Sequence, residues 1–365
     1  MSGVVSRIAE VLILGGGVIG LAIAVELRLR GATVSVVCRD FEESASLAAA
    51  GMLAPQAEGL PAGAMLDLCL RSRDRYPTWI PKIEVLSGQD AGYWPSGILA
   101  PSYGLSSDEL SPDDACLPYD RTQVLAIQPH LGDEVQGGRW FPDDAQVDNR
   151  KLARSLQAAA MALGVDLVSG VTATQVRRSG DRVTAIETTK GPMQAQHYIL
   201  ATGAWSQSLL PIPVTPRKGQ MLSVRVPGFE PAQELPLKTV LFGDDIYMVP
   251  RRDGRIIIGA TVEDVGFTPG NTPEGIMHLL KAATRLFPPI ATYSLEQFWS
   301  GYRPATPDEW PILGESPYQN LTYATGHYRN GILLTPITGQ LIADWVWNQT
   351  CDPLLKSFHW SRLSP

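Results

Sequence analysis

The sequence predicts a mixed α/β (α+β) protein, in which a discontinuous Rossmann-like domain binds a dinucleotide and a second domain carries a large antiparallel sheet. Three observations predict this fold. A glycine-rich turn follows an apolar strand at 11–20, strand–helix pieces return near the C-terminal end, and a β-rich stretch at 216–262 lies between them. The length of 365 residues is sufficient for about two domains.

The composition is that of a folded globular protein, because 44% of the residues are hydrophobic and 18% are charged. A net charge of −7 argues against nucleic acid or an anionic membrane as a partner. Glycines interrupt the apolar stretch 12–25, so we interpret it as a strand and a helix, not as a signal peptide or a membrane span. The four cysteines are scattered without C-x-x-C spacing, which predicts no metal site, no disulfide framework and a cytoplasmic protein.

The order G-x-G-x-x-G gives a mechanical role to each of its glycines, Gly15, Gly17 and Gly20. Gly15 permits the tight turn out of the strand, Gly17 leaves room for a pyrophosphate at the backbone, and Gly20 lets the next helix pack on the strand. Unsatisfied N–H groups at the start of that helix then face the phosphates. A second strand at 33–37 follows in register, so the context favours dinucleotide binding over an ordinary glycine-rich turn.

The end of the second strand departs from this pattern. An acidic residue usually binds the adenosine ribose there, but Cys38 occupies the position. Asp40, two residues later, could serve instead, or Arg39 could contact the adenosine side. The ribose contact is therefore the weakest part of the fingerprint.

Local patterns predict the remaining elements. Helical spacing over 64–86 predicts a helix that Pro77 and Pro81 kink or divide. An amphipathic helix over 148–163 is ended by Gly164, and residues 104–118 predict a loop with a short helical piece. We expect strands at 93–103, 165–169, 171–177, 182–188, 193–200, 219–226, 239–242, 246–250, 255–261 and 321–325, and helices at 273–287 and within 332–347.

Seven segments, in the same order along almost the whole chain, make it resemble the FAD-dependent D-amino-acid oxidase superfamily and, within it, the glycine oxidase family. Two of them, 48–53 and 201–205, are rich in small residues that let the backbone approach a flat cofactor, although close helix packing explains such composition equally well. The segments are 15–20, 48–53, 201–205, 247–251, 258–261, 299–304 and 326–334.

The resemblance implies a discontinuous Rossmann-like FAD-binding domain, formed by 1–84, 144–210 and 305–365, and a substrate domain with a large antiparallel sheet, formed by 85–143 and 211–304. It implies that FAD oxidises glycine and other small amines with O2 to an oxo acid, ammonia and hydrogen peroxide. In this family the reaction supplies the imine precursor of the thiamine thiazole. A homo-oligomer, as a homotetramer, is also expected by resemblance.

Site residues carry over from the family one at a time. Arg303 and Tyr247 match residues that bind the substrate carboxylate, Arg329 falls next to the flavin end of the active site, and Met52 and Ala54 match positions beside flavin and substrate. For FAD the resemblance and the glycine motif indicate Gly15, Gly17, Val18, Ile19, Gly20, Cys38, Arg39, Ala45, Ser46, Ala50, Gly51, Met52, Ala173, His327, Tyr328, Arg329, Asn330, Gly331, Ile332 and Leu333.

The residue types agree with flavin chemistry, in which the cofactor carries the redox step and the protein orients the substrate. A planar, two-pronged arginine such as Arg303 suits a carboxylate better than lysine does, and Pro304 biases its backbone toward an extended conformation. Arg329 could face the substrate or stabilise the reduced flavin. His327 is a candidate base, although its backbone place in the flavin turn also explains it.

Three alternatives stay open. A related flavin amine oxidase or dehydrogenase could act on sarcosine, D-amino acids or proline, and could pass electrons to an acceptor other than oxygen. A non-catalytic FAD-binding subunit would bind flavin without reducing it, although the pair Arg303 and Tyr247 argues against this. An NAD-linked dehydrogenase would share only the opening glycine motif.

Overall fold

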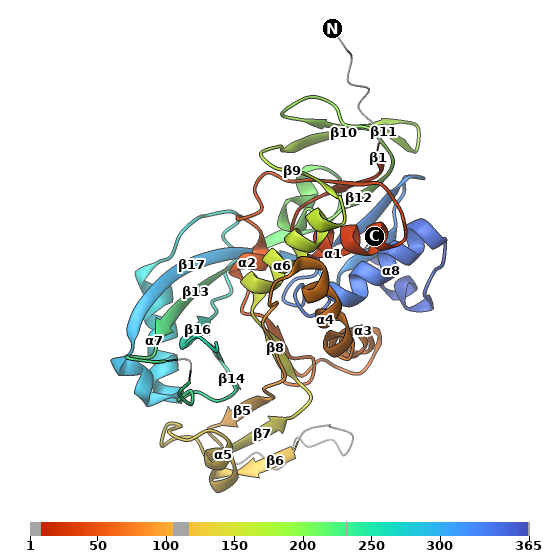
Figure 1. Cartoon of the computed structure of the whole chain (residues 1–365). Coiled ribbons are helices and arrows are strands. Elements are labelled where there is room, and N and C mark those ends of the chain that lie inside the picture. Colours follow the sequence, from red (N-terminus) through yellow and green to blue (C-terminus); the bar gives the residue numbers. More distant parts are fainter. Residues whose placement is uncertain (1–8, 105–116, 231, 364–365) are drawn as a thin grey trace.

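The computed structural model describes residues 9–104, 117–230 and 232–363. Two large sheets organise the chain (Figure 1). In the first, all neighbouring strands run parallel except the edge strand β18, which is antiparallel to β19. Its order is β18 (Ile312–Glu315), β19 (Leu321–Thr325), β12 (Ala195–Leu200), β1 (Ala9–Leu14), β2 (Val34–Val37) and β9 (Asp166–Val168).

Both faces of the six-stranded sheet are covered, which explains the uninterrupted apolar run of β1. Ile13 and Val36 pack into the core beneath the helices, while Leu12 and Leu14 pack toward the opposite face. The helices over the first face are α1 (Val18–Leu29), α3 (Ala64–Arg73), α4 (Tyr76–Ser87), α6 (Asn149–Ala162) and α8 (Thr335–Asn348), and the second face carries the hairpin of β10 (Ala173–Ser179) and β11 (Arg182–Thr188).

The predicted helix over 64–86 is two helices. The chain breaks at Asp74 and Arg75, so α3 ends before the first proline, and Pro77 lies in the first turn of α4, where a missing N–H costs little. Pro81 lies inside α4 without ending it. The helix predicted over 148–163 is confirmed as α6, which Asp148 caps through the N–H groups of Arg150 and Lys151.

The second sheet has eight strands and confirms the predicted large, mainly antiparallel sheet. Only β14 and β5 pair in parallel. Helix α7 (Pro273–Leu286) and the short α5 (Arg121–Ile127) pack on one face, where they share a hydrophobic core with the strands (Figure 1). The order is β17 (Ser294–Ala305), β13 (Thr215–Arg225), β16 (Arg255–Gly259), β15 (Tyr247–Pro250), β14 (Val240–Phe242), β5 (Ile98–Ser102), β7 (Gly137–Phe141) and β6 (Leu117–Asp120).

Strand β17 was not expected, because Gly301 and Pro304 interrupt its β signal. Both are tolerated since β17 is the edge of the eight-stranded sheet. Its pairing with β13 places Arg303 opposite Arg217 and Gly301 opposite Gly219. Strand β17 therefore places Arg303 in the interior of the molecule, although the strand itself lies at the edge of the sheet.

A small sheet joins the two large ones near the cavity described below. It contains β3 (Met52–Leu53), β8 (Ala145–Val147) and β4 (Tyr93–Trp94). The buried Arg251, at the end of β15, donates to the Ala50 carbonyl at 2.6 Å and to Gln146 Oε1 at 2.9 Å. Segment 48–53, which begins at the last residue of the short helix α2 (Ala45–Ala48), is thereby tied to the large sheet.

Four 3₁₀ segments complete the described structure, at Gly203–Ser208, Pro288–Thr292, Pro353–Phe358 and Trp360–Leu363. Most of the loop predicted at 104–118 lies outside the described residues, and its last two positions begin β6.

Within the described residues, no helix is both long and apolar enough to cross a membrane. The arrangement confirms the predicted mixed α/β fold class.

Candidate FAD and substrate site

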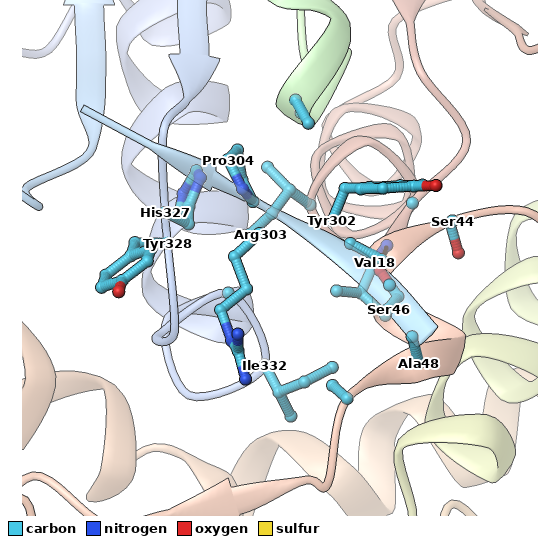
Figure 2. Close-up of a pocket in the computed structure, with 18 of the residues that line it drawn as sticks. Val18, Ser44, Ser46, Ala48, Tyr302, Arg303, Pro304, His327, Tyr328 and Ile332 are labelled. Carbon is cyan, nitrogen blue, oxygen red and sulfur yellow. Dashed lines mark hydrogen bonds between the residues drawn. The ribbon is translucent and has the colours of Figure 1, made fainter. Parts of the chain in front are cut away.

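One elongated cavity of about 500 Å³ runs from the glycine turn after β1 to the face of the eight-stranded sheet. This volume lies within the range of small-molecule and cofactor sites. Figure 2 shows the Arg303 side chain projecting from β17 into the cavity, which Tyr328, Ile332, Ser46 and Ala48 also line. Both large sheets thus contribute to one site.

The glycine turn closes the first end of the cavity in the predicted way. Gly15 has φ +116°, and a Cβ there would lie 2.2 Å from the Ala201 carbonyl oxygen. A Cβ at Gly20 would lie 2.0 Å from the Gly15 oxygen, so the helix can approach the strand only without that side chain. Gly17 precedes α1 and lines the cavity. A phosphate can therefore reach the backbone at the start of α1.

Segment 44–51 forms a second wall. The Val18 N–H donates to Ser46 Oγ at 3.0 Å, so α2 packs directly against the start of α1. Asn149 Nδ2 donates to the Ser46 carbonyl at 2.8 Å and joins this wall to α6. Gly51 has φ +77°, and a Cβ there would lie 2.0 Å from the Val147 oxygen. Packing against β8 therefore requires a residue without a side chain at position 51.

The end of β2 offers no carboxylate at the predicted position. The Cys38 thiol is buried, and burial raises its pKa to about 12, so it lines the cavity as a neutral group. Arg39 pairs with Glu43 at 2.6 Å, and its guanidinium carbon lies 4.9 Å from the centroid of the Trp205 ring. Arg39 and Trp205 together form the rim at this end of the cavity.

The turn 326–333 forms the wall opposite segment 44–51. Buried side chains from the helices hold its backbone, because Tyr76 Oη donates to the Ile332 carbonyl and Ser72 Oγ to the Leu333 carbonyl. His327 is 3% exposed, and its Nε2 lies 3.2 Å from Thr338 Oγ1. Burial lowers the pKa of His327 to about 3. The imidazole is therefore neutral at physiological pH and is a weak base.

Charged and aromatic groups gather at the other end of the cavity, near the large sheet. Arg303 Nη1 donates to the Thr261 carbonyl at 3.1 Å, and Tyr247 lies beside it on β15. Burial raises the pKa of Tyr247 although Arg303 acts in the opposite direction, so the phenol stays protonated. Arg329 lies at the exposed edge, with its guanidinium carbon 5.2 Å from the Tyr328 ring centroid.

Glu58 is a cavity residue that sequence reasoning missed. Desolvation raises the pKa of its carboxyl to about 7, against the attraction of Arg329 and Arg303. The loop that carries it is fixed from behind, since the buried Asp144 accepts from the backbone N–H groups of Gln56 and Ala57. No local sequence signal marks Glu58, because its neighbours in the site come from distant strands and turns.

The structure brings most of the expected site residues to this one cavity. Gly20, Ala54, Asn330 and Leu333 instead lie behind the wall, in contact with the backbone or the core. The cavity is lined by Gly15, Gly17, Val18, Ile19, Cys38, Arg39, Ala45, Ser46, Ala50, Gly51, Met52, Ala173, Tyr247, Arg303, His327, Tyr328, Arg329, Gly331 and Ile332.

The family model for FAD-dependent oxidoreductases (DAO) matches residues 10–345, which include all of both large sheets except Ala9, and the whole cavity. The chain belongs to the DAO family of FAD-dependent oxidoreductases. Members of this family bind FAD, and the cavity fits such an elongated cofactor, with a glycine-lined helix start at one end and the two arginines at the other. Among the described residues, no group of three or more His, Cys, Asp or Glu side chains could hold a metal ion.

The chain is similar to curated relatives of at least two kinds, bifunctional ThiO/ThiG proteins and glycine oxidases. The bifunctional protein ThiO/ThiG of Trichormus variabilis is 57% identical over 97% of this chain, which corresponds to 55% of that protein. The chain thus spans about half the length of the bifunctional relatives that it matches. The glycine oxidase of Geobacillus kaustophilus is 35% identical over 92% of each chain. Its crystal structure superimposes with a TM-score of 0.88, covering 97% of this chain and 98% of that one.

Proposed function

We propose that this protein is an FAD-dependent oxidase of glycine and other small amines, and that its product feeds the synthesis of the thiamine thiazole. The observation that carries the proposal is the presence of Arg303 and Tyr247 at the sheet end of a cavity whose other end is the glycine turn. Relatives named glycine oxidase and ThiO/ThiG support the choice of substrate.

Arg303 is the proposed clamp for the substrate carboxylate, because a guanidinium can donate two parallel hydrogen bonds. Its Nη1 is already fixed by the Thr261 carbonyl, which leaves its other N–H groups available to a ligand. Tyr247, with a protonated hydroxyl, supplies a second donor to the same carboxylate. Met52, which lines the cavity, restricts the space beside the substrate Cα.

The proposed reaction removes two electrons and two protons from the C–N bond of glycine. FAD, when bound in this cavity, would supply the two-electron acceptor, and O2 would be the final oxidant, reduced to hydrogen peroxide. The resulting imine either leaves for thiazole synthesis or adds water to give glyoxylate and ammonia. The protein's part is to orient the amine, exclude bulk water and present positive charge from Arg303 and Arg329.

The remaining proposals concern organisation. We assign 1–84, 144–210 and 305–365 to the FAD-binding domain and 85–143 and 211–304 to the substrate domain. The first set of segments supplies every strand of the six-stranded sheet, and the second set supplies the strands of the eight-stranded sheet apart from the end of β17.

We also propose a cytoplasmic homotetramer. The described cysteines Cys38, Cys69 and Cys351 are free, as is usual in a reducing compartment, and light scattering would measure the mass in solution.

The direct test is anaerobic addition of glycine to the purified, yellow protein, followed by air. We expect glycine to bleach the flavin absorption and oxygen to restore it with release of one peroxide per glycine. Sarcosine, D-alanine and D-proline assayed in parallel would rank the substrates. Bleaching without peroxide would indicate a dehydrogenase, and no bleaching by any of the four amines would contradict the proposed activity.

A further inference from the structure

A compact group of polar side chains lies immediately behind Arg303. We name it the Glu263 cluster, and it consists of Lys218, Gln220, Thr261, Glu263 and Thr272. None of the five lines the cavity, so none can touch the substrate directly. The group lies where β13 passes the chain that leaves β16.

The cluster is connected to the Arg303 guanidinium through two backbone carbonyls. Arg303 Nη1 donates to the Thr261 oxygen at 3.1 Å and more weakly to the Lys218 oxygen at 3.5 Å. The Lys218 oxygen also accepts from the Glu263 N–H at 2.9 Å. The direction in which Arg303 points therefore depends on where the backbone at 218 and 261 is held.

The carboxylate of Glu263 holds that backbone together. Its Oε1 accepts from Thr261 Oγ1 and from Gln220 Nε2, the latter at 2.7 Å. Its Oε2 lies 3.6 Å from Nζ of Lys218, whose side chain is only 2% exposed. Gln220 extends the set by accepting from the Thr272 N–H at 2.7 Å. One carboxylate thus fixes three side chains, two on β13 and one on the segment that follows β16.

Charge explains why a carboxylate is present at this position. A buried ammonium without a counter-ion is strongly unfavourable, and Glu263 is the acidic partner of Lys218. Burial acts to raise the pKa of the Glu263 carboxyl, but the hydrogen bonds from Thr261 and Gln220 and the charge of Lys218 outweigh it, and the pKa is lower than usual. The group is therefore ionised throughout the physiological range.

We infer that Glu263 is a positioning residue, which sets the orientation of the Arg303 guanidinium by fixing the Thr261 and Lys218 carbonyls and thereby determines affinity for the substrate carboxylate. The inference rests on the proposed role of Arg303 as carboxylate clamp. It predicts a defect in binding with little change in the chemical step, because the cluster contacts neither the amine nor the cofactor site.

The test measures binding of acetate, a minimal carboxylate, through its perturbation of the absorption of protein-bound FAD. Glu263→Gln removes the charge. Thr261→Val removes the hydrogen bond to Glu263, together with the one that Thr261 Oγ1 accepts from the Gln220 N–H, without leaving a buried charge unpaired. We expect each to raise the Kd of acetate and the KM of glycine roughly tenfold, as a displaced binding group does. The Kd of FAD and kcat should stay within about twofold of the wild type, because the cofactor contacts are not altered.

Glu296→Gln is the matched control. Glu296 lies on β17, pairs with Arg225 at 2.5 Å, and its side chain is 26% exposed, against 23% for Glu263. This change should leave acetate binding unaltered. A double-mutant cycle adds the connection to Arg303, since Glu263→Gln should have no further effect on acetate binding in an Arg303→Lys background.

Two results would overturn the inference while the carboxylate clamp stands. One is an acetate Kd that is unchanged in both Glu263→Gln and Thr261→Val. The other is an effect of Glu263→Gln that is fully additive with Arg303→Lys, which would mean that Glu263 acts elsewhere. Failure of the wild-type protein to bind acetate would instead contradict the proposed clamp itself, and the positioning role with it.

Discussion

The Arg303 guanidinium lies flat against the backbone of Gly219 on the neighbouring strand β13. A Cβ at Gly219 would lie 2.5 Å from Arg303 Nη1 and 2.7 Å from Cζ. Cross-strand pairing explains the proximity, because Gly219 is opposite Gly301, two residues before Arg303, and both neighbours lack side chains. The arginine reaches the cavity through space that only glycine leaves free.

Gly219→Ala should therefore weaken substrate binding without unfolding the protein. The guanidinium is the end of a flexible side chain and can move aside, but it then leaves the position in which it meets the carboxylate. We expect KM for glycine to rise by roughly tenfold or more, with FAD content unchanged. Gly104→Ala is the control, because no heavy atom of the described residues lies within 4 Å of the added methyl, and equal kinetics in the two variants would refute the packing argument.

Arg303→Ala should retain FAD and lose most affinity for amino-acid substrates. Truncating a charged, desolvated contact costs about 2–5 kcal/mol, which should be visible in kcat/KM for glycine. Arg217→Ala is the comparison, because Arg217 is the cross-strand partner of Arg303 but pairs with Asp264 at the surface. Normal glycine kinetics in Arg303→Ala would eliminate the assignment.

Glu58 should make carboxylate binding depend on pH near 7. Desolvation raises the pKa of its carboxyl to about 7, so the group is mainly neutral at pH 6 and mainly anionic at pH 8. A negative charge in the same cavity repels a carboxylate ligand. Acetate should therefore bind several-fold more tightly to the wild type at pH 6 than at pH 8.

Glu58→Gln should remove this pH dependence and give the tight binding at both pH values. Glu134→Gln offers a control, because Glu134 is exposed and pairs with Arg285 away from the cavity. If the pH profile of Glu58→Gln follows that of the wild type, another group controls binding.

Tyr76→Phe should lower the stability of the FAD-binding turn. The Tyr76 hydroxyl is buried and donates to the Ile332 carbonyl, and removal of a donor from a buried carbonyl costs about 1–3 kcal/mol. We expect a lower free energy of unfolding and weaker FAD binding in equilibrium dialysis. Tyr293→Phe is the control, since among the described residues no hydrogen bond from the Tyr293 hydroxyl is present, and comparable losses in both variants would exclude a specific role for the hydroxyl.

Local patterns predicted the elements with strong periodicity or clear breakers. The glycine turn, helix α6 and the strands of the six-stranded sheet other than the edge strand β18 follow from apolar runs, glycines and caps that act within a few residues. Strand β17 was missed because Gly301 and Pro304 weaken its local signal, and only pairing with β13 stabilises it. The break between α3 and α4 was anticipated at the prolines but lies just before them.

The sequence by itself determined the dinucleotide-binding turn at Gly15, Gly17 and Gly20 and, through resemblance, the nomination of Arg303 and Tyr247. Tertiary structure alone decided the surroundings of Arg303. Strand register brings Gly219 next to Arg303. Glu58 reaches the same cavity on a loop fixed by Asp144, and Glu263 is connected to Arg303 through the Thr261 carbonyl. The physical reason is that local backbone preferences act over a few residues, whereas the electrostatics and packing of a site depend on groups that folding brings together from distant parts of the chain.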